Sequence, residues 1–309
     1  MLQAIESLLP IILLVILGAA LSEKSFLNLE VRIGMDRFTY WIALPSLFLH
    51  TLSSTDFSEL AAGKLILILM MSTLVVCLLA ILLAAIMRMP KSAFGVFVQA
   101  TFRGNLAFVG LPLIVFALKE DMTGELISEA LLALAALIPL YNILSIILLI
   151  SAQKKISTAM LPDMLQQLGK NPLIISTLAG GLLGWFQIGL PIIVNRPLEL
   201  LGQTALALAL VSLGGALSQL QIRGNIRYSL LASLMKVAAV PAVTYGLTLL
   251  ISLPPDQQFI AMVLSACPTA AASYIMTTQL GGDSALAASS IVASTVFSMV
   301  ALALTLIWF

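Results

Sequence analysis

The chain has 309 residues, of which 61% are hydrophobic and only 9% are charged, and its mean hydropathy is +1.11. Soluble domains are near 25% charged, so this composition indicates a membrane protein. A net charge of +1 without a basic run excludes nucleic acid as a partner. Two cysteines, Cys77 and Cys267, and a single histidine, His50, form no disulfide framework and no metal-ligand set, so no metal or other cofactor is predicted.

Apolar segments follow one another along the whole chain, separated by short polar connections. No Lys or Arg precedes the first segment, which therefore reads as a retained helix and not as a signal peptide. The longest hydrophilic connector, Lys154–Lys170, reads as a linker. The sequence predicts ten transmembrane helices, at 4–22, 38–55, 65–87, 92–118, 130–153, 171–195, 200–222, 228–252, 257–280 and 284–309.

Positive charges in the connections predict the orientation of these helices, because cytoplasmic loops are enriched in Lys and Arg. Ten such residues follow odd-numbered segments and three follow even-numbered ones. The first set is Lys24, Arg32, Arg37, Arg88, Lys91, Lys154, Lys155, Lys170, Arg223 and Arg227, and the second is Lys64, Lys119 and Arg196. We therefore expect a multi-pass protein of the cytoplasmic membrane with both termini on the outer side.

Weak matches at offsets of 162–165 residues indicate an internal repeat. The matching positions are Pro10 with Pro172, Leu52 with Leu217, and Pro90 with Pro254. The repeats would cover residues 1–155 and 156–309. Because each contains five helices, an odd number, the second would be inverted relative to the first. Inverted repeats are typical of secondary transporters, whose substrate site lies where discontinuous helices meet.

The fourth segment contains a cluster that an apolar helix does not ordinarily carry. Arg103, Gly104 and Asn105 stand at its centre, and Pro112 follows two turns later. An Arg at the bilayer centre costs at least about 2.5–3.5 kcal/mol on insertion scales. The cluster therefore predicts a broken transmembrane helix that forms half of a substrate site.

The repeat predicts a matching break in the ninth segment. Asn105 corresponds to Thr269 at an offset of 164 residues, and Pro268 there removes a backbone donor. Cys267 and Ser273 lie on either side of these two residues. The all-α fold is thus predicted to contain crossing, broken fourth and ninth helices.

The predicted crossing favours an anion. Helix N-termini carry partial positive charge, and Arg103 lies too deep to reach the interface easily. No segment holds an Asp or Glu within its interior, so carbonyls, amides, water or the substrate must satisfy Arg103; we expect carbonyls and substrate, although a purely structural Arg is an equal alternative. The substrate-site candidates are Arg103, Gly104, Asn105, Pro268, Thr269, Ser273 and Asn142.

Further residues are candidates for structural or coupling roles, namely Pro112, Cys267, Lys236 and His50. Lys236 is expected to extend to the cytoplasmic interface, the alternative being a strut that holds the eighth helix against the crossing. His50 is a minor candidate for a proton acceptor. A relay of paired carboxylates is excluded for want of carboxylates. Proton coupling, a sodium site of neutral oxygens at Asn105, Thr269 and Ser273, and uncoupled movement all remain open.

Intramembrane enzymes find little support in the sequence. Gly281-Gly282-Asp283 is similar to an aspartyl protease motif, but Asp283 stands in a connection and has no second intramembrane Asp as a partner. No Gly-x-Ser-x-Gly stretch supports Ser218 with His50 as a serine protease. We therefore expect a protein that is not an enzyme.

Three stretches resemble the auxin efflux carrier family: Phe102–Leu113, Pro268–Met276 and Lys236–Ala242. The resemblance extends over essentially the whole chain. It implies ten helices in inverted repeats, with helices 1, 2, 6 and 7 as a scaffold and the others as a moving domain. It also implies substrates such as auxin, malonate or malate, bound at Asn105 and at the break around Pro268-Thr269. Plant members place an asparagine beside the second proline, where this chain has Cys267 and Thr269.

These observations predict a secondary transporter that moves small organic anions by elevator-like alternating access. The alternative is a membrane-embedded sensor that binds the same ligands without net transport. The expected partners are the anion, the lipid bilayer and a second copy of the chain, since Gly180-xxx-Gly184 is a pattern of close helix contacts.

Overall fold

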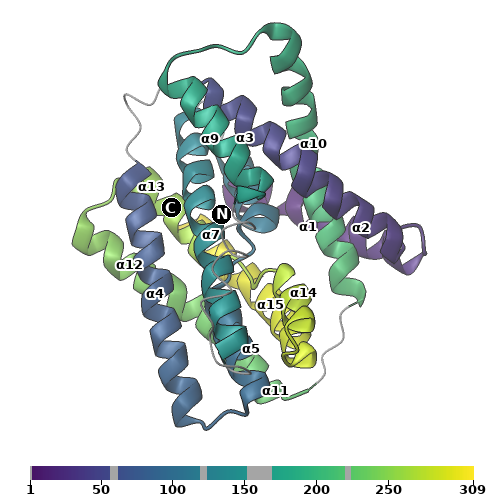
Figure 1. The fold of residues 1–309 in the computed structure, drawn as a ribbon, viewed down its shortest axis with the longest axis vertical. Coiled ribbons are helices and arrows are strands. Elements are labelled where there is room, and N and C mark those ends of the chain that lie inside the picture. Colours follow the sequence, from purple (N-terminus) through teal and green to yellow (C-terminus); the bar gives the residue numbers. More distant parts are fainter. Residues whose placement is uncertain (1, 56–61, 119–123, 152–168, 220–223) are drawn as a thin grey trace. The chain divides into compact units, whose positions relative to one another are not determined.

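The computed structural model describes residues 2–55, 62–118, 124–151, 169–219 and 224–309, which are helical apart from connections and one isolated antiparallel bridge (Figure 1). The all-α expectation is therefore confirmed for these residues. Five helices are long and apolar enough to cross a membrane, judged by length and composition. These are Ala62–Ile86, Glu125–Ser151, Ile192–Ser218, Ile226–Ile251 and Ser284–Trp308, and shorter apolar helices cover Leu9–Glu23, Leu106–Ala117 and Pro172–Trp185. The inverted ten-helix arrangement stays a prediction, and most of the linker Lys154–Lys170, with the boundary between the two expected repeats, lies outside the described residues.

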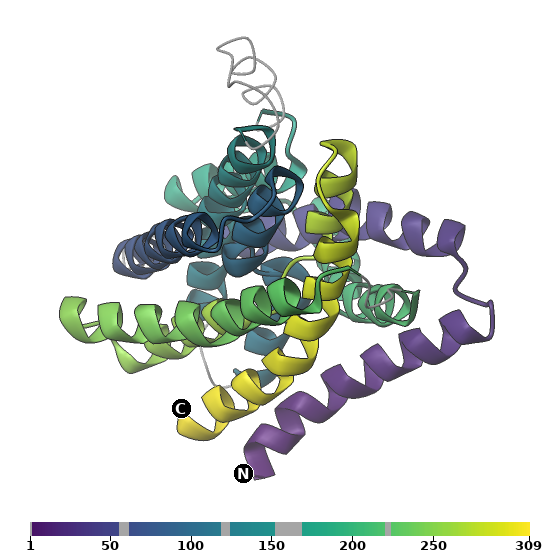
Figure 2. The same cartoon turned by 90° about the horizontal axis from the view of Figure 1, so that it is seen from below.

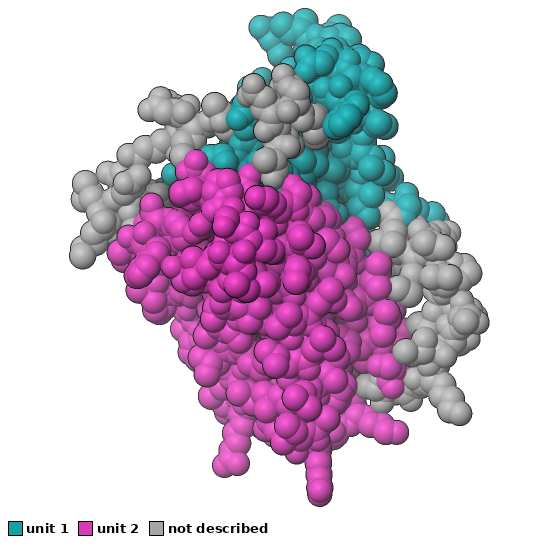
Figure 3. Space-filling model, turned by 90° about the vertical axis from the view of Figure 1, so that its left-hand side faces the viewer, with its two compact units in different colours: residues 1–62, 107–135, 161–219 teal, residues 63–106, 136–160, 220–309 magenta. Residues whose placement is uncertain are grey.

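The chain divides into two compact units, and each takes segments from both halves of the sequence (Figure 3). Unit 1 comprises residues 1–62, 107–135 and 161–219, and unit 2 comprises residues 63–106, 136–160 and 220–309. Apart from residues 107–135, unit 1 corresponds to the helices that the family resemblance groups as a scaffold. The chain passes from unit 2 to unit 1 between Leu106 and Ala107, directly after the expected break in the fourth helix.

Unit 1 is built on close contacts between helices. Its elements are α1 (Leu2–Glu23), α2 (Leu29–Phe38), the π-helix η1 (Thr39–Ala43), α3 (Leu44–Ser53), α6 (Leu111–Ala117), the start of α7 (Gly124–Ser151), α9 (Pro172–Trp185) and α10 (Ile192–Gln219). Asn171 caps α9, its side chain accepting from the N–H of Leu173 at 2.9 Å, with Pro172 in the first turn.

Glycines set the spacing of the helices in unit 1. A Cβ at Gly18 of α1 would overlap the carbonyl of Val211 in α10, and a Cβ at Gly214 would overlap that of Val15. Gly180 of α9 packs less tightly against Leu49 of α3, with the nearest backbone atom 3.1 Å from an ideal Cβ. Gly180 of the Gly180-xxx-Gly184 pattern thus serves a contact within the chain, and the expected homodimer stays a prediction.

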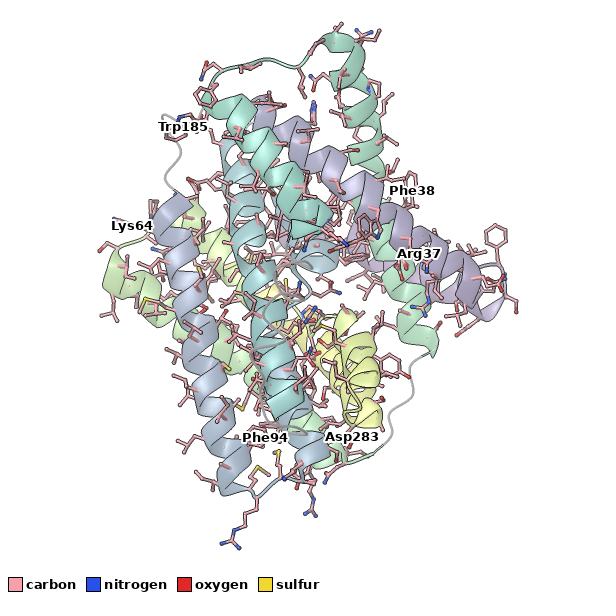
Figure 4. The ribbon with its side chains drawn as sticks, viewed as in Figure 1. Arg37, Phe38, Lys64, Phe94, Trp185 and Asp283 are labelled. Atoms are coloured by element: carbon pink, nitrogen blue, oxygen red, sulfur yellow. The ribbon has the colours of Figure 1, made fainter. Side chains whose placement is uncertain are left out.

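Unit 2 contains α4 (Ala62–Ile86), α5 (Lys91–Phe102), most of α7, α11 (Ile226–Leu234), the π-helix η4 (Met235–Ala239), α12 (Val240–Ile251), α13 (Pro255–Ala266), α14 (Ala272–Gln279) and α15 (Ser284–Trp308). α15 packs across α11, where the yellow and green helices cross in Figure 2. Figure 4 places Phe94 and Asp283 at one end of this unit and Lys64 at the other. The N–H of Asp283 donates to the carbonyl of Ser92 at 3.0 Å, which joins the starts of α5 and α15.

Each π-helix in the described residues ends two residues before a proline. η1 precedes Pro45, η2 (Leu106–Gly110) precedes Pro112, and η4 precedes Pro241. A proline inside an α-helix has no N–H to donate and clashes with the carbonyl four residues earlier. A turn widened to the i→i+5 register relieves this conflict, as in the bonds from Leu44 N–H to Thr39 O and from Val240 N–H to Met235 O.

Candidate functional site

The two predicted helix breaks are present and are bonded to each other. α5 ends at Phe102 and α13 ends at Ala266, and an isolated antiparallel bridge joins Gly104 to Thr269. The N–H of Asn105 donates to the carbonyl of Pro268 at 2.8 Å, and the N–H of Ala270 donates to that of Arg103 at 2.9 Å. Backbone groups released by both breaks therefore satisfy one another. We call this part of unit 2, residues 103–105 and 267–271, the crossing.

Side chains satisfy further backbone groups at the crossing. In continuous helices the carbonyls of Ala100 and Ser265 would accept from residues 104 and 269. Instead, the hydroxyl of Thr269 donates to Ala100 O at 2.8 Å, and Lys236 Nζ donates to Ser265 O at 2.6 Å. The N–H of Thr269 donates to Ser294 Oγ of α15 at 3.0 Å. Specific bonds thus satisfy several of the backbone groups that the breaks release, as buried backbone requires.

Gly104 is closely surrounded at the crossing. An ideal Cβ on Gly104 would lie 3.0 Å from Leu106 Cδ2, 3.5 Å from Lys236 Cε and 3.7 Å from Cys267 Cβ. Lys236 and Cys267 therefore flank the glycine, and the thiol of Cys267 donates to Val263 O at 3.2 Å. The tightest of these contacts is the one with Leu106, in the same segment as Gly104.

Arg103 is held by two neutral groups from other helices. Its Nη2 donates to Asn142 Oδ1 of α7 at 2.8 Å, and its Nη1 donates to Met276 Sδ of α14 at 2.7 Å. We expected backbone carbonyls and substrate; an amide, one of the other options, and a thioether take these two positions. Asn142 is thereby placed at the site through Arg103.

A buried amide that the sequence analysis missed lies beside Arg103. Gln99 is fully buried one turn before Arg103 in α5, and the hydroxyl of Thr277 donates to its Oε1 at 3.4 Å. The spacing of four residues along α5 was the available signal, because it puts Gln99 and Arg103 on one face of the helix.

Lys236 corrects an expectation. The side chain was expected to reach the cytoplasmic interface, but it is 0% exposed. Its ammonium group donates a hydrogen bond to the carbonyl of Ser265. The π-helix that contains Lys236 packs against α13. The alternative, a link between the eighth helix and the crossing, is what the structure shows.

Two polar side chains in or next to the crossing remain available for a ligand. Within the described residues the side-chain amide of Asn105 makes no hydrogen bond, although its backbone does. The hydroxyl of Ser273, at the start of α14, is 2% exposed and has no partner among the described residues either. Buried polar groups of this kind are rare in native structures unless a ligand or water satisfies them.

The sequence matches the model of a family described as membrane transport proteins, over residues 3–306. The chain belongs to this family. It is the auxin efflux carrier family that the three motifs resemble. The chain is also similar to an uncharacterized transporter of Methanocaldococcus jannaschii, with 25% identity over 305 residues that cover 97% of this chain and 96% of the relative.

Two candidate residues of this family member belong to unit 1. Pro112 is buried in the first turn of α6. His50 Nδ1 lies 2.7 Å from Asn195 Oδ1, so α3 and α10 are joined by a ring-to-amide hydrogen bond. Pro112 and His50 are therefore not part of the crossing, which belongs to unit 2.

A buried carboxylate corrects a second expectation. α7 begins at Gly124, so Glu129 lies in its second turn, where it is 5% exposed; the expected segment began only at residue 130. Asp36 of α2 accepts a short hydrogen bond from the hydroxyl of Ser212 in α10. Both carboxylates belong to unit 1. Glu129 thus lies within an apolar helix that is long enough to cross a membrane, and proton or sodium coupling stays a prediction.

Proposed function

We propose that this protein is a secondary transporter that moves small organic anions across the cytoplasmic membrane by alternating access. The crossing would be its substrate site. The observation that carries the proposal is the burial of two cationic side chains, Arg103 and Lys236, beside one pair of broken helices. Membership of a membrane transport protein family supports the general activity.

Charge is the first argument for an anion. Arg103 and Lys236 bring two positive charges into the interior of unit 2, where their side chains are 7% and 0% exposed. Positive charge in a buried site attracts an anion more strongly than it would in water. A carboxylate substrate would supply negative charge in a medium where charge-assisted hydrogen bonds are strong.

The available polar groups are the second argument. Asn105 offers an amide and Ser273 offers a hydroxyl, and a substrate carboxylate or hydroxyl group can use both. α14 begins directly after the second break, so its N-terminal N–H groups add partial positive charge at the same place. Malonate, malate and auxin-like carboxylates fit this set of groups, and they are the substrates that the family resemblance implies.

The division into two units supports a rigid-body mechanism. The breaks in both helices, Asn105, Ser273 and the two cations all belong to unit 2. A binding site carried by one body keeps its geometry while that body moves, and alternating access in inverted-repeat transporters is largely a rigid-body motion.

Flux into proteoliposomes tests the proposal. Purified protein would be reconstituted, and uptake of labelled malonate, malate and indole acetate would be compared with that of empty liposomes under proton, sodium and voltage gradients. We expect saturable uptake of at least one anion by the wild type and its loss in Asn105→Ala. Binding of these anions without flux under any gradient would contradict transport and indicate a sensor.

A further inference from the structure

The C-terminal end of α13 is a place where a cation is favoured. In a continuous helix the carbonyl of Ser265 would accept from the N–H of Thr269, but that N–H donates to Ser294 Oγ. Pro268, the residue before Thr269, has no N–H to donate. The last carbonyls of a helix also carry partial negative charge. In broken-helix transporters the coupling cation binds at ends of this kind.

At the C-terminal end of α13, the positive charge is supplied by the ammonium group of Lys236. Its ammonium lies 2.6 Å from Ser265 O, and its whole side chain is inaccessible to solvent. A lysine ammonium carries the same single positive charge as Na⁺ or NH₄⁺ and donates hydrogen bonds to carbonyl oxygens. It differs from them in being attached to η4, so it is present in every molecule.

The other half of the crossing provides an internal comparison. Ala100 O stands four residues before Gly104, as Ser265 O stands four residues before Thr269. A neutral hydroxyl, that of Thr269, satisfies Ala100 O. The two half-helix ends are therefore completed differently, and only the end of α13 receives a full charge among the bonds described.

We propose that the Lys236 ammonium replaces a coupling cation at the end of α13, so that the crossing needs no sodium. The consequence for transport rests on the function proposed above: anion flux should be independent of sodium. The occupancy of the cation position by Lys236 stands apart from flux and can be measured on the purified protein alone. Removal of the side chain should convert the position into a site for a small cation from solution.

Thermal unfolding of the detergent-solubilised full chain tests this directly. The midpoint Tm would be measured against increasing NH₄⁺, methylammonium or Na⁺, with N-methylglucamine holding the ionic strength constant. We expect Lys236→Ala to have a lower Tm than the wild type, and NH₄⁺ or Na⁺ to raise that Tm in a saturable manner. The wild type and Lys64→Ala, a matched variant at the exposed end of α4, should show no saturable rise.

Two results would overturn the proposal. One is a saturable rise in the Tm of the wild type with Na⁺, because the position would then bind a free cation despite Lys236. The other is a Lys236→Ala protein whose Tm no small cation raises, because the lysine would then serve only packing or the substrate. If Lys236→Ala does not fold, the Tm of the wild type against Na⁺ still tests the proposal. Lys236→Arg keeps the charge, so its Tm is expected to remain insensitive to Na⁺.

Flux separates this proposal from the proposed function. Wild-type uptake in sodium and in N-methylglucamine should agree within about twofold, and a tenfold loss without sodium would contradict the role of Lys236. A protein that moves no anion but whose Lys236→Ala variant is stabilised by NH₄⁺ would refute the transport function and leave the cation replacement in place.

Discussion

Asn105 and Pro268 are bonded through their main chains, with the amide N–H of one residue 2.8 Å from the carbonyl oxygen of the other. The side chain of Asn105 takes no part in this bond. Structure and ligand binding at this residue can therefore be separated by mutation, because Asn105 contributes to the crossing through its backbone.

Asn105→Ala is expected to lower anion transport by at least about tenfold while leaving Tm nearly unchanged. A lost hydrogen bond to a charged ligand costs about 1.5–3 kcal/mol, which corresponds to about 10–150-fold. Labelled uptake in proteoliposomes and thermal unfolding measure the two effects. Ser72→Ala is a suitable control, since Ser72 is buried in α4 and bonds only to Leu69 O of its own helix. Uptake by Asn105→Ala at the wild-type rate would refute the site.

Asn142→Leu is expected to destabilise the protein by about 1.5–3 kcal/mol, because it removes an acceptor from the buried guanidinium of Arg103. Unfolding by denaturant in mixed micelles would measure this loss. A double-mutant cycle with Arg103→Met isolates the pair: the double variant should lose less than the sum of the single losses. Additive losses would show that the hydrogen bond contributes nothing.

Ser294→Ala is expected to cost about 1–3 kcal/mol, because it leaves the buried N–H of Thr269 without its acceptor. Ser298→Ala provides the matched control on the same helix. Its hydroxyl donates only to Thr295 O of α15, and its removal should have a smaller effect. Equal losses of unfolding free energy in the two variants would argue against a role of Ser294 in the break.

Gly18→Ala and Gly214→Ala are each expected to cost about 1–3 kcal/mol through overpacking of α1 against α10. Gly34→Ala in α2 is the control, since an ideal Cβ there meets nothing within 4 Å. That change should be neutral or stabilise by up to about 1 kcal/mol. The same denaturant titration applies, and a stabilised Gly18→Ala protein would show that the helices are not in this close contact.

The sequence was sufficient to locate the breaks because each depends on local chemistry. Gly104 weakens a helix, Pro268 removes a donor, and the repeat offset connects the two positions. Asn171 and Pro172 likewise mark the start of α9 by capping rules that act over a single turn. Features determined within one or two turns are those that one sequence can reveal.

Features that depend on helix rotation were not predictable in this way. Depth along a helix suggested that Lys236 could reach the interface, but depth does not say which face it occupies, and it faces the crossing. The π-helices of the described residues change that rotation by widening one turn before a proline, which a hydrophobic pattern does not record. Met276 as a partner of Arg103 has no sequence signal, because thioethers are seldom assigned to charged donors.

The backbone bonds of the crossing join residues about 165 positions apart in the chain. During synthesis, Arg103 and the carbonyl of Ala100 emerge long before Thr269, Met276 or Ser294 exist. Contacts of such sequence separation are slow to form, since a long loop must close before they contribute. Until the ninth helix is inserted, Arg103 lacks its contact with Met276, and the carbonyl of Ala100 lacks its bond from Thr269. Assembly in the membrane, more than insertion of any one helix, should be the slow step in making this protein.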